Sequence, residues 1–343
     1  MRPRFVVEPS MAHAQEGTLH RPSARVREFR PEDYAAITNV YNAVDPDYPS
    51  TEGEVRQEDD QWDREKYVQV RYVAADAGTG AIAALAEYNH MPWSFDPRRF
   101  SAWIGVRPDR QGQGIGSGLY DRLFEDFRAR GATSLRVWAR EDRAVSIAFL
   151  QHRGYRELER AWESRLDLTA FDLSPFADRA IVPSGIEVVT LAEELAKDPE
   201  ALRKVYAFDA LVSLDTPRLD PHTTPEYDVW RSHATGPWFL PEAFFLAKDG
   251  DAIVGQSDLG KSEAEPDLLY TGFTGVRREY RGRGIAWALK LRALTWAKER
   301  GYRKVRTWNS TRNAQMLGIN VALRFQKQPV WITFAKDLSE GLG

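Results

Sequence analysis

Residues 106–123 read VRPDRQGQGIGSGLYDRL, and every second residue from 112 to 118 is glycine. The preceding stretch FSAWIGV, residues 100–106, has the composition of a strand, and apolar residues recur at every fourth position from Ile115 to Phe127, as on one helix face. Glycine tolerates positive φ and close approach of another molecule. The free N–H groups and dipole of a helix start attract anions. The segment therefore predicts a strand-to-helix turn that binds phosphate.

Two familiar phosphate motifs do not fit this turn. A nucleotide P-loop requires a lysine followed by serine or threonine, and none follows these glycines. A dinucleotide fingerprint counted from Gly112 would need glycine where Ser117 stands. The remaining pattern is Gln111-x-x-Gly114-x-Gly116. It resembles the [Q/R]-x-x-G-x-[G/A] pyrophosphate loop of the GNAT superfamily of N-acetyltransferases.

The same pattern occurs a second time along the chain. Residues 276–294 read VRREYRGRGIAWALKLRAL, in which Arg281-x-x-Gly284-x-Ala286 satisfies the motif. The two copies stay in one register, 170 positions apart, well beyond the loop. A tandem duplication is therefore predicted. The matching pairs include Gly105 and Gly275, Val106 and Val276, Gly112 and Gly282, Ile115 and Ile285, Leu119 and Leu289, and Trp138 and Trp308.

Length supports two domains, because 343 residues exceed one ordinary core. Residues 1–23 are polar and aperiodic and are expected to form a mobile tail. The first domain is predicted over residues 24–172 and the second over residues 185–343. Between them, the segment 173–184 contains two prolines and little periodicity, which is typical of a linker.

The order of elements predicts an α/β fold class in each half. Strands and a hairpin come first, with turns at residues 78–80 and 249–250, and a strand-helix-strand-helix-strand series follows. Each half is therefore expected to be a mixed, mostly antiparallel sheet with helices on both faces. This order resembles the GNAT fold. The resemblance implies a β-bulge in the strand before each loop, at Gly105-Val106 and at Gly275-Val276.

Composition excludes several other classes of function. The net charge of −3 gives no basic footprint for nucleic acid. The longest apolar run, residues 81–86, is far too short to span a membrane, and the N-terminus lacks an apolar signal core. The chain has no cysteine, and its histidines lack metal-ligand spacing, so no metal is assigned. A cytoplasmic location is expected, while the oligomeric state stays open.

The resemblance implies acetyl-CoA or a related acyl-CoA as acyl donor, with its pyrophosphate on the loop amides, and direct transfer of the acyl group to an amine. The residues expected to bind the donor lie in both copies. They are Val106, Gln111, Gly112, Gln113, Gly114, Ile115 and Gly116 in the first, and Val276, Arg281, Gly282, Arg283, Gly284, Ile285, Ala286 and Asn313 in the second.

Catalysis requires a base for the amine and a proton donor for the departing thiolate. Many GNAT members carry a tyrosine donor on the last helix, but Leu150 and Asn320 occupy the aligned positions. The candidate catalytic residues are Asp258, Tyr270 and Asn313 in the second copy and Glu87 in the first. A water relay would need no special side chain.

The second copy is the better candidate for the working site. It has Arg283 where the first has Gln113, which adds a cation suited to phosphate. It also has Asn313 where the first has Arg143, and family members often place asparagine near cofactor and substrate. It departs from the family pattern at Arg324, where glycine is usual.

The acceptor is expected to meet residues 214–239, which are rich in prolines, acids and aromatics. This composition favours a small cationic amine, although the segment could instead pack between domains. The favoured hypothesis is an N-acetyltransferase for a small molecule. A non-catalytic acyl-CoA sensor and a protein N-acetyltransferase remain as alternatives.

Overall fold

The computed structural model describes residues 24–339, so the predicted tail at residues 1–23 lies outside the described residues. The described chain forms two compact units. Unit 1 contains residues 24–161, 219–223 and 329–339, and unit 2 contains residues 162–218 and 224–328. Within residues 24–339, no helix is both long and apolar enough to cross a membrane.

Unit 1 is built on a mixed, mostly antiparallel sheet in the order β1-β2-β3-β4-β5-β13-β6. Its one parallel pair joins β4 and β5 through only three residue pairs, from Arg99–Ser134 to Ser101–Arg136. The two strands therefore part toward their C-terminal ends. The strands are β1 Ala24–Glu28, β2 Gln69–Asp76, β3 Ile82–Asn89, β4 Arg99–Val106, β5 Ser134–Arg140, β6 Arg156–Asp167 and β13 Trp331–Asp337.

The helices of unit 1 pack their apolar faces on this sheet. The predicted phosphate-loop helix is α3, which buries Leu119, Leu123 and Phe127 and contacts β3 and β4. Helix α2 begins at a capping box, in which the Thr51 hydroxyl accepts the Glu54 amide and the Glu54 carboxylate accepts the Thr51 amide. The helices are α1 Tyr34–Val44, α2 Glu52–Asp60, α3 Ile115–Ala129 and α4 Ala144–His152.

Unit 2 repeats the arrangement in the order β11-β10-β9-β8-β7, with the short β12 paired to the second half of β6. The mixed α/β fold class is thus confirmed in both units. The predicted acceptor segment contains a helix, α7, that its prolines had concealed. The elements are β7 Ile186–Thr190, α5 Leu191–Lys197, α6 Ala201–Ser213, α7 Tyr227–Ala234, β8 Phe244–Asp249, β9 Ala252–Lys261, β10 Leu268–Val276, α8 Ile285–Glu299, β11 Lys304–Ser310, α9 Ala314–Ala322 and β12 Gln326–Lys327.

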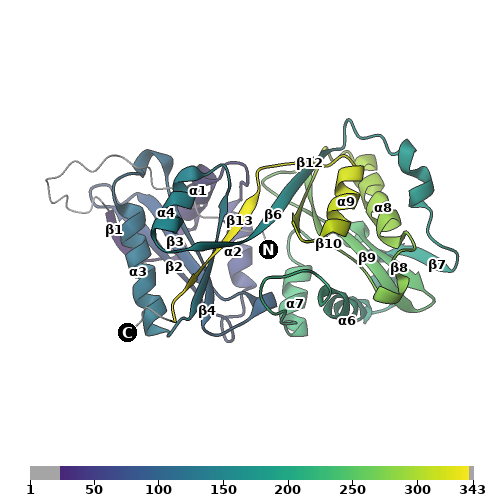
Figure 1. Ribbon diagram of the computed structural model, residues 1–343, viewed down its shortest axis with the longest axis horizontal. Coiled ribbons are helices and arrows are strands. Elements are labelled where there is room, and N and C mark those ends of the chain that lie inside the picture. Colours follow the sequence, from purple (N-terminus) through teal and green to yellow (C-terminus); the bar gives the residue numbers. More distant parts are fainter. Residues whose placement is uncertain (1–23, 340–343) are drawn as a thin grey trace. The chain divides into compact units, whose positions relative to one another are not determined.

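The C-terminal strand belongs to unit 1, not to the copy from which it comes. All seven residues of β13 pair with β5, and its other edge pairs with residues 156–161 of β6, as Figure 1 shows. Among the described residues, the compact units therefore differ from the predicted ranges 24–172 and 185–343 at residues 162–172, 219–223 and 329–339. Strand pairing over such distances is set by backbone hydrogen bonds, which the local apolar pattern does not encode.

The unusual arginine after the last helix does not change the path of the chain. Helix α9 ends at Ala322, and Arg324 has φ 62°. The aligned Gly154 after α4 has φ 77°. Both copies therefore end this helix with a left-handed residue, and unit 2 accepts the strain of a side chain there.

We predict that Phe334→Ala, in β13, destabilises the protein by about 3–5 kcal/mol, because Phe334 is 1% exposed and a large cavity would remain. Amide hydrogen exchange should accelerate in β5, whose Val137 pairs with Phe334. Leu289→Ala in α8 of unit 2 is the matched control and should leave β5 protected. Faster exchange confined to β10 and β11 in Phe334→Ala would contradict the assignment of β13 to unit 1.

Candidate functional site

Unit 2 contains an open pocket of about 760 Å³. It lies where the end of β10, the glycine loop, and the first turns of α8 and α9 meet. The loop and its helix contribute Val276, Arg281, Gly282, Gly284, Ile285 and Ala286, and α9 contributes Asn313 at its start. The structure therefore brings together seven of the residues that the sequence predicted. The other lining residues include Val212, Asp215, Thr216, Pro217, Phe273, Thr274, Trp287, Arg312 and Met316.

The glycine loop has the geometry of an anion site. Gly282 and Gly284 have φ 74° and 86°, a left-handed conformation that glycine adopts without strain, and Gly284 is the N-cap of α8. The first residue of the motif fixes the loop, because Arg281 Nε donates to the Val276 carbonyl over 3.0 Å. In unit 1 the Gln111 amide donates to the Val106 carbonyl over 3.1 Å. Both side chains thus serve the same structural role.

Two arginines near this loop form ion pairs with the same carboxylate. Asp215 accepts from Arg278 Nε at 2.8 Å and from Arg281 at 2.5 Å. These bonds, the first above all, hold the pKa of Asp215 at about 2, so it is ionised at neutral pH. Arg179, from the predicted linker, also lines the pocket and stacks on Trp287. Sequence reasoning missed Asp215 and Arg179, since neither lies in a motif.

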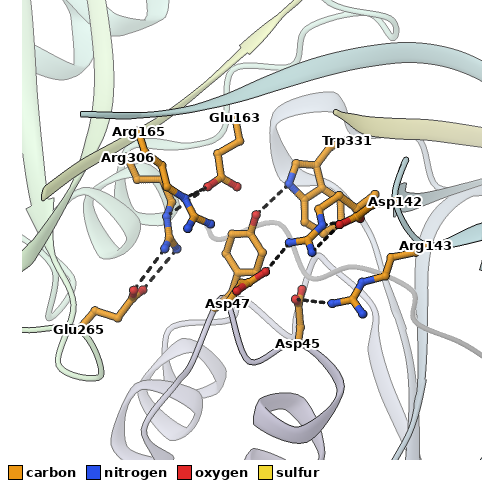
Figure 2. A network of polar contacts seen from close by, with 11 residues as sticks. Asp45, Asp47, Asp142, Arg143, Glu163, Arg165, Glu265, Arg306 and Trp331 are labelled. Atoms are coloured by element: carbon orange, nitrogen blue, oxygen red, sulfur yellow. Dashed lines mark hydrogen bonds and ion pairs between the residues drawn. The ribbon is translucent and has the colours of Figure 1, made fainter. Parts of the chain in front are cut away.

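Asn313 lines the pocket, whereas Arg283 is not among its lining residues. The Arg283 guanidinium lies over the Tyr280 ring, 5.1 Å from its centroid. Asn313 is the N-cap of α9, where its side-chain oxygen accepts the Met316 amide at 3.2 Å. In unit 1 the aligned Arg143 makes no such cap and pairs instead with Asp45 at 3.8 Å (Figure 2).

Strand β10 carries a bulge next to the pocket. Its pairing with β9 shifts register between Thr271 and Thr274. Gly275 and Val276, where the bulge was expected, pair regularly with Gln256 and Gly255, so the predicted position was wrong and the bulge lies before it. Asp258 of β9 enters this bulge, and one of its oxygens accepts the Phe273 amide at 2.9 Å. A Cβ on Gly272 would lie 1.7 Å from the other oxygen, so only glycine admits the carboxylate. Burial raises the pKa of Asp258 to about 7, and the charge of Asp209 adds to this rise.

Asp209, whose charge acts on Asp258, is bonded to a tryptophan of α7. Asp209 lies on α6, which packs against β9 and β10. Its carboxylate accepts Trp230 Nε1 of α7 at 3.0 Å, and burial raises its pKa above the usual range. The predicted acceptor segment thus supplies Trp230 to the site, while Asp209 itself was not predicted. Its signal, a lone acid on an otherwise apolar helix face, is weak in sequence.

Tyr270 lies earlier on β10 within a second polar group. Its hydroxyl donates to Glu265 at 2.8 Å, and its ring stacks on Trp308 with 5.6 Å between centroids. Arg306, 2% exposed, pairs with Glu265 at 3.2 Å and with the fully buried Glu163 at 3.4 Å, as Figure 2 shows.

In unit 1 the carboxylate that corresponds to Asp258 is Glu87, and it makes different contacts. Glu87 accepts Arg71 Nε at 2.7 Å and the Tyr41 hydroxyl at 2.8 Å, within a buried ion-pair group. Strands β3 and β4 pair without a register shift from Ala84–Val106 to Asn89–Ser101. The bulge expected at Gly105-Val106 is therefore absent, and that expectation was wrong. With Glu87 held by Arg71, no carboxylate is available for a strand amide that a bulge would release.

Apolar side chains fill the region of unit 1 around β4, β5, α3 and α4. The cavity there is about 20 Å³, room for about one water molecule. The loop itself is retained, since Gly112 and Gly114 have φ 72° and 78°, and Ile115 and Gly116 are buried in α3. Gln113 lies beside it and accepts a long bond of 3.4 Å from Arg110.

Unit 2 thus combines an anion loop, an open pocket and a bulge that holds Asp258. The sequence matches the acetyltransferase (GNAT) family over residues 37–155 and 208–320. The chain belongs to this family.

Curated relatives are named mycothiol acetyltransferase. The protein of that name from Thermobifida fusca is 28% identical over 246 residues, covering 67% of this chain and 71% of the relative. The one from Geodermatophilus obscurus is 29% identical over 190 residues, and the match spans 54% of each chain. The chain thus covers only about half the length of this second relative.

Solved structures share the tandem fold. A tandem GNAT protein from the clavulanic acid biosynthesis pathway has a TM-score of 0.72 at 19% identity, covering 92% of this chain and 98% of that one. A GCN5-related N-acetyltransferase from Sphaerobacter thermophilus has a TM-score of 0.68 at 19% identity, covering 93% and 96%.

The pKa of Asp258 makes stability depend on pH. Because the folded pKa of about 7 exceeds the ordinary value, the stabilising effect of the proton is complete below about pH 4 and is lost as pH rises through 7. Asp258→Asn keeps a carbonyl for the Phe273 amide and removes this loss. We therefore compare the free energy of unfolding of Asp258→Asn with that of the wild type at each pH. This difference should favour the variant by about 1–3 kcal/mol more at pH 8 than at pH 4.

Denaturant unfolding at both pH values tests this expectation. Asp121→Asn, on the exposed face of α3, is the control and should show no such difference. Equal behaviour of the two variants would mean that Asp258 is not a buried acid.

Proposed function

We propose that unit 2 binds acetyl-CoA in its pocket and transfers the acetyl group to a primary amine of a small molecule. The observation that carries this proposal is the juxtaposition of the anion loop, the open pocket and the bulge that holds Asp258. The curated relatives support acetyl transfer, and their name favours a small acceptor over a protein.

The pocket suits the donor in size and charge. Its volume of about 760 Å³ falls within the range of ligand sites, roughly 300–1,000 Å³. In this proposal the amides of residues 282–286, at the start of α8, bind the pyrophosphate of acetyl-CoA. Arg281 and Arg283 are the cations beside it. The pairing of β10 with β11 ends at Tyr270, and the β10 amides beyond it are proposed to bond the amide groups of pantetheine. Pyrophosphate would compete with Asp215 for Arg281.

Asp258 is the proposed general base. A carboxylate with a pKa of about 7 is ionised in a large fraction of molecules at neutral pH and still accepts a proton readily. It takes the proton of the incoming ammonium group, and the neutral amine forms the new C–N bond at the thioester carbon as the C–S bond breaks. The newly bonded nitrogen then loses its second proton to solvent, and the thiolate takes up one proton, which Asp258 can return through water. A base at the bulge favours catalysis over a binding sensor.

Tyr270 and Asn313 have supporting roles in this proposal. Tyr270, held by Glu265 and stacked on Trp308, forms an aromatic wall on the acceptor side. Asn313 caps α9 and so fixes the pocket edge that Met316 lines. Glu87 stabilises the interior of unit 1 rather than acting on substrate. A cytoplasmic location remains a prediction.

The donor-binding proposal is tested with a matched pair of loop variants. Gly284→Asp places a carboxylate against the pyrophosphate position, and Gly114→Asp introduces the same change, at a similar positive φ, in unit 1. Calorimetry with acetyl-CoA should show at least a tenfold loss of affinity for Gly284→Asp and little change for Gly114→Asp. The reverse order would assign the donor site to unit 1, and wild-type affinity in both would refute the loop assignment.

The catalytic proposal is tested through the pH profile. For the wild type, kcat/KM should rise with pH through about 7 and then level, because Asp258 acts when ionised. Asp258→Asn should lose about 10²–10⁴-fold in kcat and lack this rise. Its affinity for acetyl-CoA, measured in parallel, should be unchanged. A variant with full turnover would show that water alone receives the proton.

A further inference from the structure

The segment between the two copies packs against α8, the helix that follows the glycine loop of unit 2. Its residues Ser174–Ala180 form a 3₁₀ helix in contact with α8. Two interactions hold it there. Lys298 Nζ, near the end of α8, donates to the Phe171 carbonyl, and the Phe176 ring stacks on Trp287 with 6.2 Å between centroids. The segment therefore has a defined place beside the pocket.

Arg179, near the end of this 3₁₀ helix, brings a positive charge to the pocket wall. It lines the pocket, and its guanidinium carbon lies over the Trp287 ring, 4.4 Å from the centroid. Among residues 24–339, its guanidinium forms no hydrogen bond or ion pair. A guanidinium that lies over a ring uses its face, so the N–H groups at its edge stay available for an anion.

The pocket has more positive charge than its glycine loop alone requires. Among the described residues that line it, the arginines are Arg179, Arg281 and Arg312, and Asp215 is the one carboxylate. Asp215 pairs with Arg281 at 2.5 Å and so offsets that charge. The remaining cations suit a ligand that carries a second anionic group besides the pyrophosphate.

The aromatic surface under Arg179 distinguishes the copy that has the open pocket. The position aligned with Trp287, 170 residues earlier, is Ser117. Its hydroxyl accepts a hydrogen bond from Arg153 at 3.0 Å, within unit 1. The combination of an arginine over a tryptophan at the pocket wall therefore belongs to unit 2 and not to the repeated framework.

We propose that Arg179 binds the 3′-phosphate of coenzyme A and so selects this donor over its dephosphorylated form. The inference rests on the acetyl-CoA binding proposed above and adds the recognition of the nucleotide end. With the pyrophosphate on the loop and pantetheine along β10, the adenosine and its 3′-phosphate meet the part of the pocket that β10 does not line. Arg179 and Trp287 lie in that part.

The chemistry of the two groups is complementary. A phosphate monoester carries about two negative charges at neutral pH, and its oxygens accept strong hydrogen bonds. The planar guanidinium can donate to two of these oxygens at once. Because the Trp287 ring fixes the orientation of the guanidinium, less side-chain freedom is lost on binding. Arg179 is therefore a specificity-determining residue for the donor.

The test compares two ligands that differ only in this phosphate. Calorimetry measures the affinity of the full chain for CoA and for 3′-dephospho-CoA. We expect the wild type to bind CoA at least tenfold more tightly, since a charge-assisted bidentate contact is lost with the phosphate. The same ratio is expected between acetyl-CoA and acetyl-dephospho-CoA.

Variants connect this preference to Arg179. Arg179→Gln should bind CoA at least tenfold more weakly and 3′-dephospho-CoA as the wild type does, which also shows that it is folded. Arg179→Lys should recover part of the preference, because it keeps the charge without the planar fork. Arg300→Gln is the matched control, since Arg300 lies over Trp296 of the same helix at 4.3 Å but does not line the pocket. Arg312→Gln tests the other pocket arginine and should keep the preference.

The outcomes separate this inference from the proposed function. Equal affinity of the wild type for both ligands, or a preference that survives in Arg179→Gln, overturns the role of Arg179 and leaves acetyl-CoA binding standing. Equal weakening of both ligands by Arg179→Gln also overturns it. Loss of the preference in Arg312→Gln alone would assign the phosphate to Arg312, and loss in Arg300→Gln would reveal a general effect of charge. A wild type that binds neither ligand refutes the donor-binding proposal together with this inference.

Discussion

The bond between the Phe273 amide and Asp258 is the interaction on which the site of unit 2 depends. A bulge removes a strand amide from its ladder, and a buried amide without an acceptor is costly. Asp258 supplies that acceptor over 2.9 Å, and Gly272 leaves the space for it. Burial of the carboxyl group raises its pKa to about 7, although the bond from the Phe273 amide opposes this rise. Asp258 thus satisfies the amide that the bulge releases, and its raised pKa suits the proton transfer proposed above.

The two copies differ because their corresponding carboxylates, Glu87 and Asp258, form hydrogen bonds with different groups. In unit 1, Glu87 is bound by Arg71 and Tyr41, and β4 continues its regular pairing with β3. Apolar side chains fill the region that would otherwise open. Unit 1 keeps the glycine turn, which shows that the turn can persist as a connection between strand and helix. An anion loop alone therefore does not establish a ligand site.

Much of the fold could be predicted because its signals are local. The glycines that require positive φ, the apolar spacing of α3, and the repeat at 170 positions specify the turn, the helix and the duplication from neighbouring residues alone. Arg281 and Asn313 could be predicted for the same reason. Arg281 is the first residue of the loop motif before α8, and Asn313 directly precedes α9. The helix α7 was missed because nearby prolines and a polar sequence conceal a short amphipathic stretch.

What the sequence by itself determined is the family, the two glycine turns and the order of elements, each set by interactions within a few residues. Only the tertiary structure decided that β13 pairs with β5, that a bulge forms in one copy, and that Asp209 of α6 lies near enough to Asp258 for its charge to act there. These features depend on backbone and charge partners brought together by folding. Asp209 lies forty-nine residues before Asp258 in the chain, and no periodicity relates them. Their relation arises because α6 packs over the bulged strand, and that packing is a property of the whole unit.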